Sequence, residues 1–137
     1  GLRTLIKKGD PAALKVVEAE PDPYVSVQEI DVEPLRPAIG ERAEIRVIVA
    51  NKGTVARDVI VDYQIHFRRS DGTLRPTTFK LGRVTVQAGG TALVRKYHAF
   101  KSVKTRTLHP GRHGLVAQAN GSQSRRIGFD LLEARGA

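Results

Sequence analysis

Between Tyr24 and Leu131 the apolar residues recur at every second position, in short runs separated by turn-forming residues. Successive side chains of a β-strand point to opposite faces, so this alternation places the apolar residues on one face of a sheet. The pattern therefore predicts strands over this part of the chain. The most regular run has its apolar residues at Val59, Val61, Tyr63, Ile65 and Phe67.

Turn signals divide the alternating region into seven or eight strands. Further runs lie at 43–49, 79–81, 84–86, 91–100, 115–119 and 127–131. The separating turns are Asn51-Lys52-Gly53, Ser70-Asp71-Gly72-Thr73, Gly89-Gly90 and Asn120-Gly121, of which the last is a strong hairpin signal. This spacing predicts an all-β fold over residues 21–137, an immunoglobulin-like antiparallel β-sandwich. Because cysteine and tryptophan are absent, we expect Tyr63 and Phe67 to fill its central core.

The first strand contains a change of parity. Val25 and Val27 fall on one face, whereas Ile30 and Val32 fall on the other. Such a change predicts a β-bulge, or a strand that crosses from one sheet to the other.

Residues 1–20 have a different pattern, which predicts one or two short helices. Leu2, Leu5 and Ile6 have helical spacing, and Asp10 followed by Pro11 is typical of a helix start. Helices this short are marginal alone. We therefore interpret this segment as the tail of an upstream helical domain, and the chain, which contains no methionine, as a piece of a longer protein.

Composition excludes several classes of site and of protein. The chain has no cysteine, which removes disulfides and thiolate chemistry. No apolar run approaches the roughly 18 residues of a membrane span, and no signal-peptide pattern opens the chain. A length of 137 residues suits one domain. We expect a cytoplasmic monomer with no membrane association.

The positive charge is concentrated in one stretch. Residues 72–129 contain eleven Lys or Arg and no Asp or Glu, in a chain of net charge +9. A segregated basic block favours an anionic partner, and arginine matches phosphate oxygens well. We predict binding to the phosphate backbone of a nucleic acid; the alternative is a solvated sheet face whose charges keep the protein in solution. The candidate DNA-binding residues are Arg95, Lys96, Lys101, Lys104, Arg106, His109, Arg112, His113, Arg125 and Arg126.

Catalytic and metal sites are not predicted. His109 and His113 are four residues apart, but Pro110-Gly111 between them makes a turn rather than the helix of a zinc site. Asp58 and Asp62 share a strand face at roughly 13 Å, too far apart for a carboxylate pair. We expect no metal, no cofactor and no catalytic residue in this chain.

Four segments together resemble the C-terminal part of bacterial DNA alkylation repair proteins. They are RTLIKKGDPAAL, PYVSVQEIDVEP, GERAEIRVIVANKG and KTRTLHPGRHGLVAQANGS, the last followed by FDL. Within these proteins the segments resemble the alkylpurine DNA glycosylase C (AlkC) family. In that family an immunoglobulin-like domain follows HEAT-like helical repeats, so the resemblance implies that residues 1–20 end such a repeat domain.

The resemblance implies a parent DNA glycosylase that removes N-alkylated bases such as 3-methyladenine without a cofactor. Its catalytic carboxylates would lie in the helical repeats, outside this chain, and the immunoglobulin-like domain would help to enclose the duplex. The positions that match the family's basic late segment are Lys104, Arg106, His109, Arg112 and His113. Two alternatives stay open: a structural or adhesion module with no nucleic-acid role, and an independent enzyme.

Overall fold

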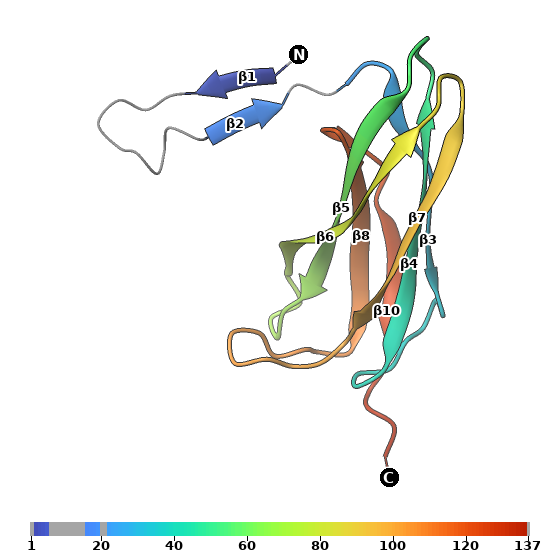
Figure 1. Cartoon of the computed structure of the whole chain (residues 1–137). Coiled ribbons are helices and arrows are strands. Elements are labelled where there is room, and N and C mark those ends of the chain that lie inside the picture. The colour runs from blue at the N-terminus through green and yellow to red at the C-terminus, as the bar shows by residue number, and fades with distance from the viewer. Residues whose placement is uncertain (1, 6–15, 20–21, 137) are drawn as a thin grey trace.

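Two antiparallel sheets pack face to face in the computed structural model, which describes the backbone of residues 2–5, 16–19 and 22–136 and the side chains of residues 22–136 (Figure 1). The first sheet has the order β3-β4-β7, with β3 at Val25–Glu33, β4 at Arg42–Asn51 and β7 at Thr91–Ala99. The second has the order β10-β8-β5-β6, with a short β9 also paired to β8. Its strands are β5 (Arg57–Arg68), β6 (Leu74–Val86), β8 (Gly111–Ala119), β9 (Ser122–Gln123) and β10 (Ile127–Leu131). The predicted all-β sandwich is confirmed.

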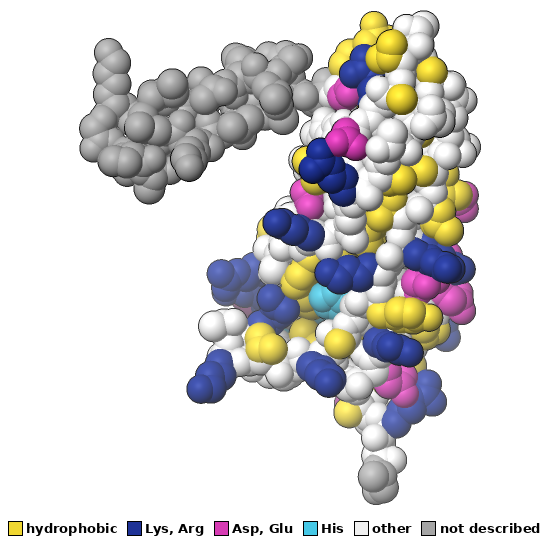
Figure 2. All heavy atoms as spheres, in the orientation of Figure 1, with side chains coloured by type: hydrophobic (Ala, Val, Ile, Leu, Met, Phe, Trp, Pro, Cys, Tyr) yellow, Lys and Arg dark blue, Asp and Glu magenta, His cyan; other side chains and the backbone are white. Residues whose placement is uncertain are grey.

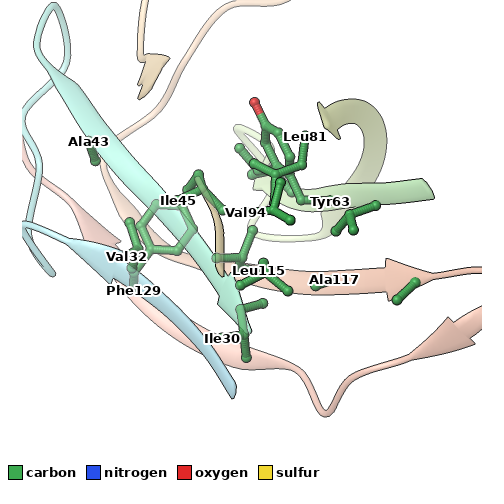
Figure 3. Close-up of a cluster of buried hydrophobic side chains, with 14 of the residues drawn as sticks. Ile30, Val32, Ala43, Ile45, Tyr63, Leu81, Val94, Leu115, Ala117 and Phe129 are labelled. Carbon is green, nitrogen blue, oxygen red and sulfur yellow. The ribbon is translucent and has the colours of Figure 1, made fainter. Parts of the chain in front are cut away.

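The core lies between the two sheets and consists mainly of aliphatic side chains (Figure 3). Alternate residues of β5 supply one wall, as the sequence predicts, and Ile45 and Val47 of β4 lie in the opposite wall with no exposed surface. Tyr63 and Phe67 are 2% and 5% exposed, so their predicted place in the core is confirmed. Burial of these alternating faces is what holds the two sheets together.

The predicted bulge in the first strand is also confirmed. The register between β3 and β4 shifts between Val27 and Glu29, and Ile30 and Val32 beyond the shift are buried. A second shift, opposite Val61 and Asp62 of β5, lies in β6. Residues 79–86 were expected to form two shorter strands. They belong instead to the single 13-residue strand β6, because the bulge absorbs the change of parity.

The Asn120-Gly121 hairpin is present between β8 and β9. Asn120 and Gly121 have φ angles of 45° and 87°, the left-handed values that such a two-residue turn requires. The Asn120 side chain also ties the turn to β5, since its Oδ1 accepts a hydrogen bond from the Ile60 amide at 2.8 Å.

The helical prediction for residues 1–20 is wrong where the structure describes them. Leu2–Leu5 (β1) and Val16–Ala19 (β2) form a two-stranded antiparallel sheet, and residues 6–15, including the expected helix start at Asp10, lie outside the described residues. Short segments nucleate helices poorly, whereas pairing two strands satisfies the backbone groups of both. The described part of the chain contains no helix that could span a membrane.

Candidate nucleic-acid interface

The connection between β7 and β8, residues 100–110, carries four of the predicted contact residues. Phe100 and Leu108 anchor this β7–β8 loop in the core, with 0% and 7% exposure. Between them, Val103 and Arg106 exchange backbone hydrogen bonds of 2.8 and 3.0 Å and close a tight turn. Lys104 lies in this turn and is exposed. The loop is therefore held at both ends and projects its charged tip into solvent.

Arg106 is positioned by aromatic rings. Its guanidinium carbon lies 4.5 Å from the centroid of the Phe67 ring and 5.4 Å from that of Phe79. Cation–π attraction favours this stacked arrangement, and the planar group keeps its edge free for hydrogen bonding. Arg106 is thus held in place before any partner arrives.

Beside Arg106 the β7–β8 loop and the β5–β6 hairpin enclose a pocket of about 510 Å³. Its lining includes four arginines, one histidine and four hydroxyl side chains, and no acidic residue. The arginines are Arg68, Arg69, Arg75 and Arg106. We call the pocket formed by all the lining residues the arginine pocket. Within the described residues, no carboxylate forms an ion pair with any of these four.

Three arginines lie against glycines of the second sheet. The space where Gly114 lacks a Cβ atom is occupied by the side chain of Arg126, and the corresponding space at Gly128 by Arg112. Arg68 covers Gly111 in the same way, so all three arginine side chains lie close to the backbone. This end of the sheet therefore has a basic outer surface.

Figure 2 shows Lys and Arg side chains gathered over the half of the sandwich that carries the β7–β8 loop. Lys101 and Lys104 are exposed in this loop, and Arg125 is exposed on the chain that leads into β10. Arg112 is exposed as well, but its Nη1 lies 3.2 Å from Asp130 Oδ2, so its charge is partly compensated.

Arg95 and Lys96 belong to the other sheet, on β7. Arg95 Nε lies 4.0 Å from Glu44 Oε2, in a surface of mixed charge. Lys96 faces the edge of β6, where its Nζ donates to the Lys80 carbonyl at 3.3 Å. The structure thus separates Arg95 from the other predicted contacts and leaves Lys96 beside them.

The two histidines of the HPGRH motif have different environments. His109 lines the arginine pocket. His113 is 1% exposed and its Nδ1 lies 2.9 Å from the Gly111 carbonyl, so its predicted place on a contact surface is wrong. It alternates with Arg112 along β8 and therefore points into the core. Burial lowers its pKa below the usual value.

A third histidine, His98, lies beneath the arginine pocket. Its Nδ1 is 2.7 Å from the Tyr63 hydroxyl, and the rings of Tyr63, Phe67, Phe79 and Phe100 surround it. Burial, and then the charges of Arg106 and Lys96, lower its pKa to about 4. At neutral pH the ring is uncharged, so it adds no charge to the core below Arg106.

Three arginines of the pocket were absent from the predicted set. Arg68 and Arg69 lie before Asp71 and so fall outside residues 72–129, the stretch that contains no Asp or Glu. Arg75 lies just after the same turn. The signal that could have found them is the hairpin itself. Its register pairs Arg68 with Leu74 and Phe67 with Arg75, which brings both sides of the turn together.

The described residues contain no group of three or more His, Asp or Glu side chains placed to hold a metal ion. Asp58 contacts Arg83 and accepts a hydrogen bond from Thr85, rather than pairing with Asp62. Arg83 lowers the pKa of this carboxyl.

Comparison with known proteins identifies the domain. The family model described as "Uncharacterised protein YhaZ, C-terminal Ig-like domain" matches residues 26–133. The chain belongs to this family. A relative within curated proteins, the uncharacterised YhaZ of Bacillus subtilis (strain 168), is 26% identical over 129 residues, which are 94% of this chain and 36% of the relative. The YhaZ-type domain thus spans little more than a third of that protein.

Solved structures similar to the YhaZ-type domain include a DNA-bound enzyme. Alkylpurine DNA glycosylase AlkC of Pseudomonas fluorescens, bound to DNA containing an abasic site analog, superposes with a TM-score of 0.73 and 26% identity over 80% of this chain and 30% of that one. A β-glucosidase of Listeria innocua, in complex with glucose, gives 0.61 and 12% over 88% of this chain and 17% of that one. A β-glucosidase of Erythrobacter marinus gives 0.64 and 18% over 79% and 15%. The glucosidase likenesses show the sandwich fold alone.

Proposed function

We propose that this immunoglobulin-like domain is an accessory DNA-binding domain of an AlkC-like DNA glycosylase and contacts the phosphate backbone of duplex DNA. The observation that carries the proposal is the gathering of cations from β5, β6, β8 and the β7–β8 loop at one end of the second sheet. The structural likeness to a DNA-bound AlkC, at 26% identity, supports DNA as the anionic partner.

The contact would be electrostatic and independent of sequence. Lys and Arg side chains that neutralise phosphates release condensed counterions, and such contacts position a protein without reading bases. A repair enzyme that searches for rare lesions needs this kind of binding. The proposed residues are Lys96, Lys101, Lys104, Arg106, His109, Arg112, Arg125 and Arg126, extended by Arg68, Arg69 and Arg75.

The whole protein would be a monomeric cytoplasmic enzyme that excises N-alkylated bases. A HEAT-like repeat domain ahead of this chain would hold the damaged duplex and the catalytic carboxylates, and the domain described here would close on the DNA from the other side. A weak module gains effective concentration from such a linkage, so a modest intrinsic affinity would suffice.

The experiment that tests the proposal is fluorescence anisotropy of this chain with a short labelled duplex, titrated over a range of salt concentrations. We expect log K to fall linearly with log salt, with a slope of about −0.9 for each phosphate neutralised. The proposal would be refuted, and a structural module favoured, if this chain did not bind DNA at low salt and the full-length protein, with its other DNA-contacting residues substituted, did not bind either.

A matched pair of double variants locates the contact. Lys104→Ala with Arg126→Ala removes one Lys and one Arg from the proposed surface, and should reduce the slope by about 1.8. Lys52→Ala with Arg83→Ala removes the same charges from the opposite end of the sandwich, where both residues are exposed. Equal losses in the two variants would show that only net charge matters, and would remove this surface from the proposal.

A further inference from the structure

We infer that the arginine pocket is a specific phosphate-ester site, built to hold one phosphate with its attached sugar. The inference deepens the proposed function, on which it rests for the identity of the occupant, a single phosphodiester of DNA. It differs from a diffuse basic surface because it assigns one anchoring position, in which Arg106 is the central group.

The charge of the pocket calls for an anion. Arg75 and Arg106 line one small volume together, and within the described residues no carboxylate pairs with them. Asp71, which lies in the adjacent turn, is engaged by Thr73, whose amide and hydroxyl donate at 2.9 and 2.6 Å, and its charge acts on Arg69. Like charges so placed repel one another, and a bound anion would relieve that repulsion.

The donors of the pocket suit phosphate better than a carboxylate. Besides the guanidinium groups, the lining offers the hydroxyls of Ser70, Thr77, Thr105 and Thr107. Phosphate presents several acceptor oxygens in three dimensions, so it can use arginine forks and hydroxyl donors at the same time. The volume of about 510 Å³ lies in the range of small-molecule sites, and leaves room for a sugar beside the phosphate.

The pocket is also organised in advance. Arg106 is fixed by its stack on Phe67 and Phe79, and by the paired backbone hydrogen bonds with Val103. The opposite wall is the β5–β6 hairpin, closed by its own Arg69–Thr73 and Gly72–Arg69 backbone hydrogen bonds of 2.7 and 2.9 Å. Groups held in this way lose little conformational entropy when an anion binds.

The test follows the arginine Nε–Hε signals by NMR during titration of the intact chain with inorganic phosphate, and then with a deoxynucleoside monophosphate. We expect saturable shifts of Arg106 and its pocket neighbours, and tighter binding of the nucleotide because its sugar occupies the remaining volume. Arg83, at the other end of the sandwich, is the internal reference and should not shift. Shifts that are linear in phosphate and equal at all arginines would overturn the inference.

The second arm measures duplex binding by anisotropy. Arg106→Ala should lose about tenfold in affinity, the weight of one charge-assisted arginine–phosphate bond, against about threefold or less for the control Arg83→Ala. Arg106→Lys keeps the charge but not the stacked fork, and should fall near Arg106→Ala. Full rescue by lysine would overturn the site, since a point charge would then be enough.

The two arms separate the failures. Duplex binding in which Arg106→Ala matches Arg83→Ala, with no saturable phosphate shift, would overturn the pocket and leave the proposed function standing. Saturable nucleotide binding without duplex binding, both in this chain and in the full-length protein whose other DNA contacts have been removed, would assign the phosphate-ester site to a free nucleotide and end the DNA proposal.

Discussion

Acid should destabilise this domain through His98, because the buried ring must gain a proton that the core does not accommodate. Its pKa is lowered from 6.5 to about 4, first by burial and then by Arg106 and Lys96. Between these values the unfolded chain binds a proton that the folded chain does not, so stability is complete above pH 6.5 and falls as the pH is lowered toward 4. At about 1.4 kcal/mol for each pKa unit, this difference in pKa lowers the free energy of unfolding by about 3 kcal/mol at pH 4.

The assay is urea denaturation at a series of pH values from 7 to 4, on the native chain and on His98→Gln. The variant changes stability at every pH, but it removes the titration, so its pH-dependent loss should be smaller by about 3 kcal/mol. Part of the loss should remain, because burial also lowers the pKa of His66 and His113. If His98→Gln keeps the whole pH-dependent loss, the assignment to His98 is refuted.

Three further changes test other parts of the structure by the same denaturation assay. Tyr63→Phe removes the hydroxyl that pairs with His98 Nδ1 at 2.7 Å, and should cost about 1–3 kcal/mol because a buried ring nitrogen loses its partner; an unchanged midpoint would contradict this. Asn51→Ala removes three hydrogen bonds, to Val55 O, Val86 O and the Gly53 amide, at 2.8, 3.0 and 2.9 Å, and should cost about 3 kcal/mol at about 1 kcal/mol each. Gly111→Ala should lower the free energy of unfolding by about 1–3 kcal/mol, since φ at Gly111 is 128° and the new Cβ would lie 2.6 Å from Arg68 Cδ. The control Gly128→Ala meets only the movable end of Arg112 and should change stability by no more than about 0.5 kcal/mol. Equal effects of the two substitutions would show that the left-handed backbone at Gly111 does not matter.

Much of the sandwich could be predicted because its signals are local. The alternation of β4 and β5 follows from the period of two of an extended chain, and the parity change in β3 gave its bulge. The Asn120-Gly121 turn could also be predicted from the sequence, since few other residues accept left-handed backbone angles. The N-terminal strands were missed because a capping pattern such as Asp10-Pro11 indicates only where a helix could begin, and not whether strand pairing competes with it.

The sequence alone determined that the positive charge is concentrated, because the absence of acids from residues 72–129 needs no structure to be seen. It also placed Lys104, Arg106 and Arg112 in the basic block. Only the tertiary structure decided which cations meet. Strand pairing sets the faces, so His113 turned inward and Arg112 outward, while β7 placed Arg95 on the other sheet beside Glu44. The β5–β6 register and the anchored β7–β8 loop brought Arg68 and Arg75 to the same pocket as Arg106, across about thirty to forty residues of chain. This proximity depends on long-range packing and cannot be read from the local sequence pattern.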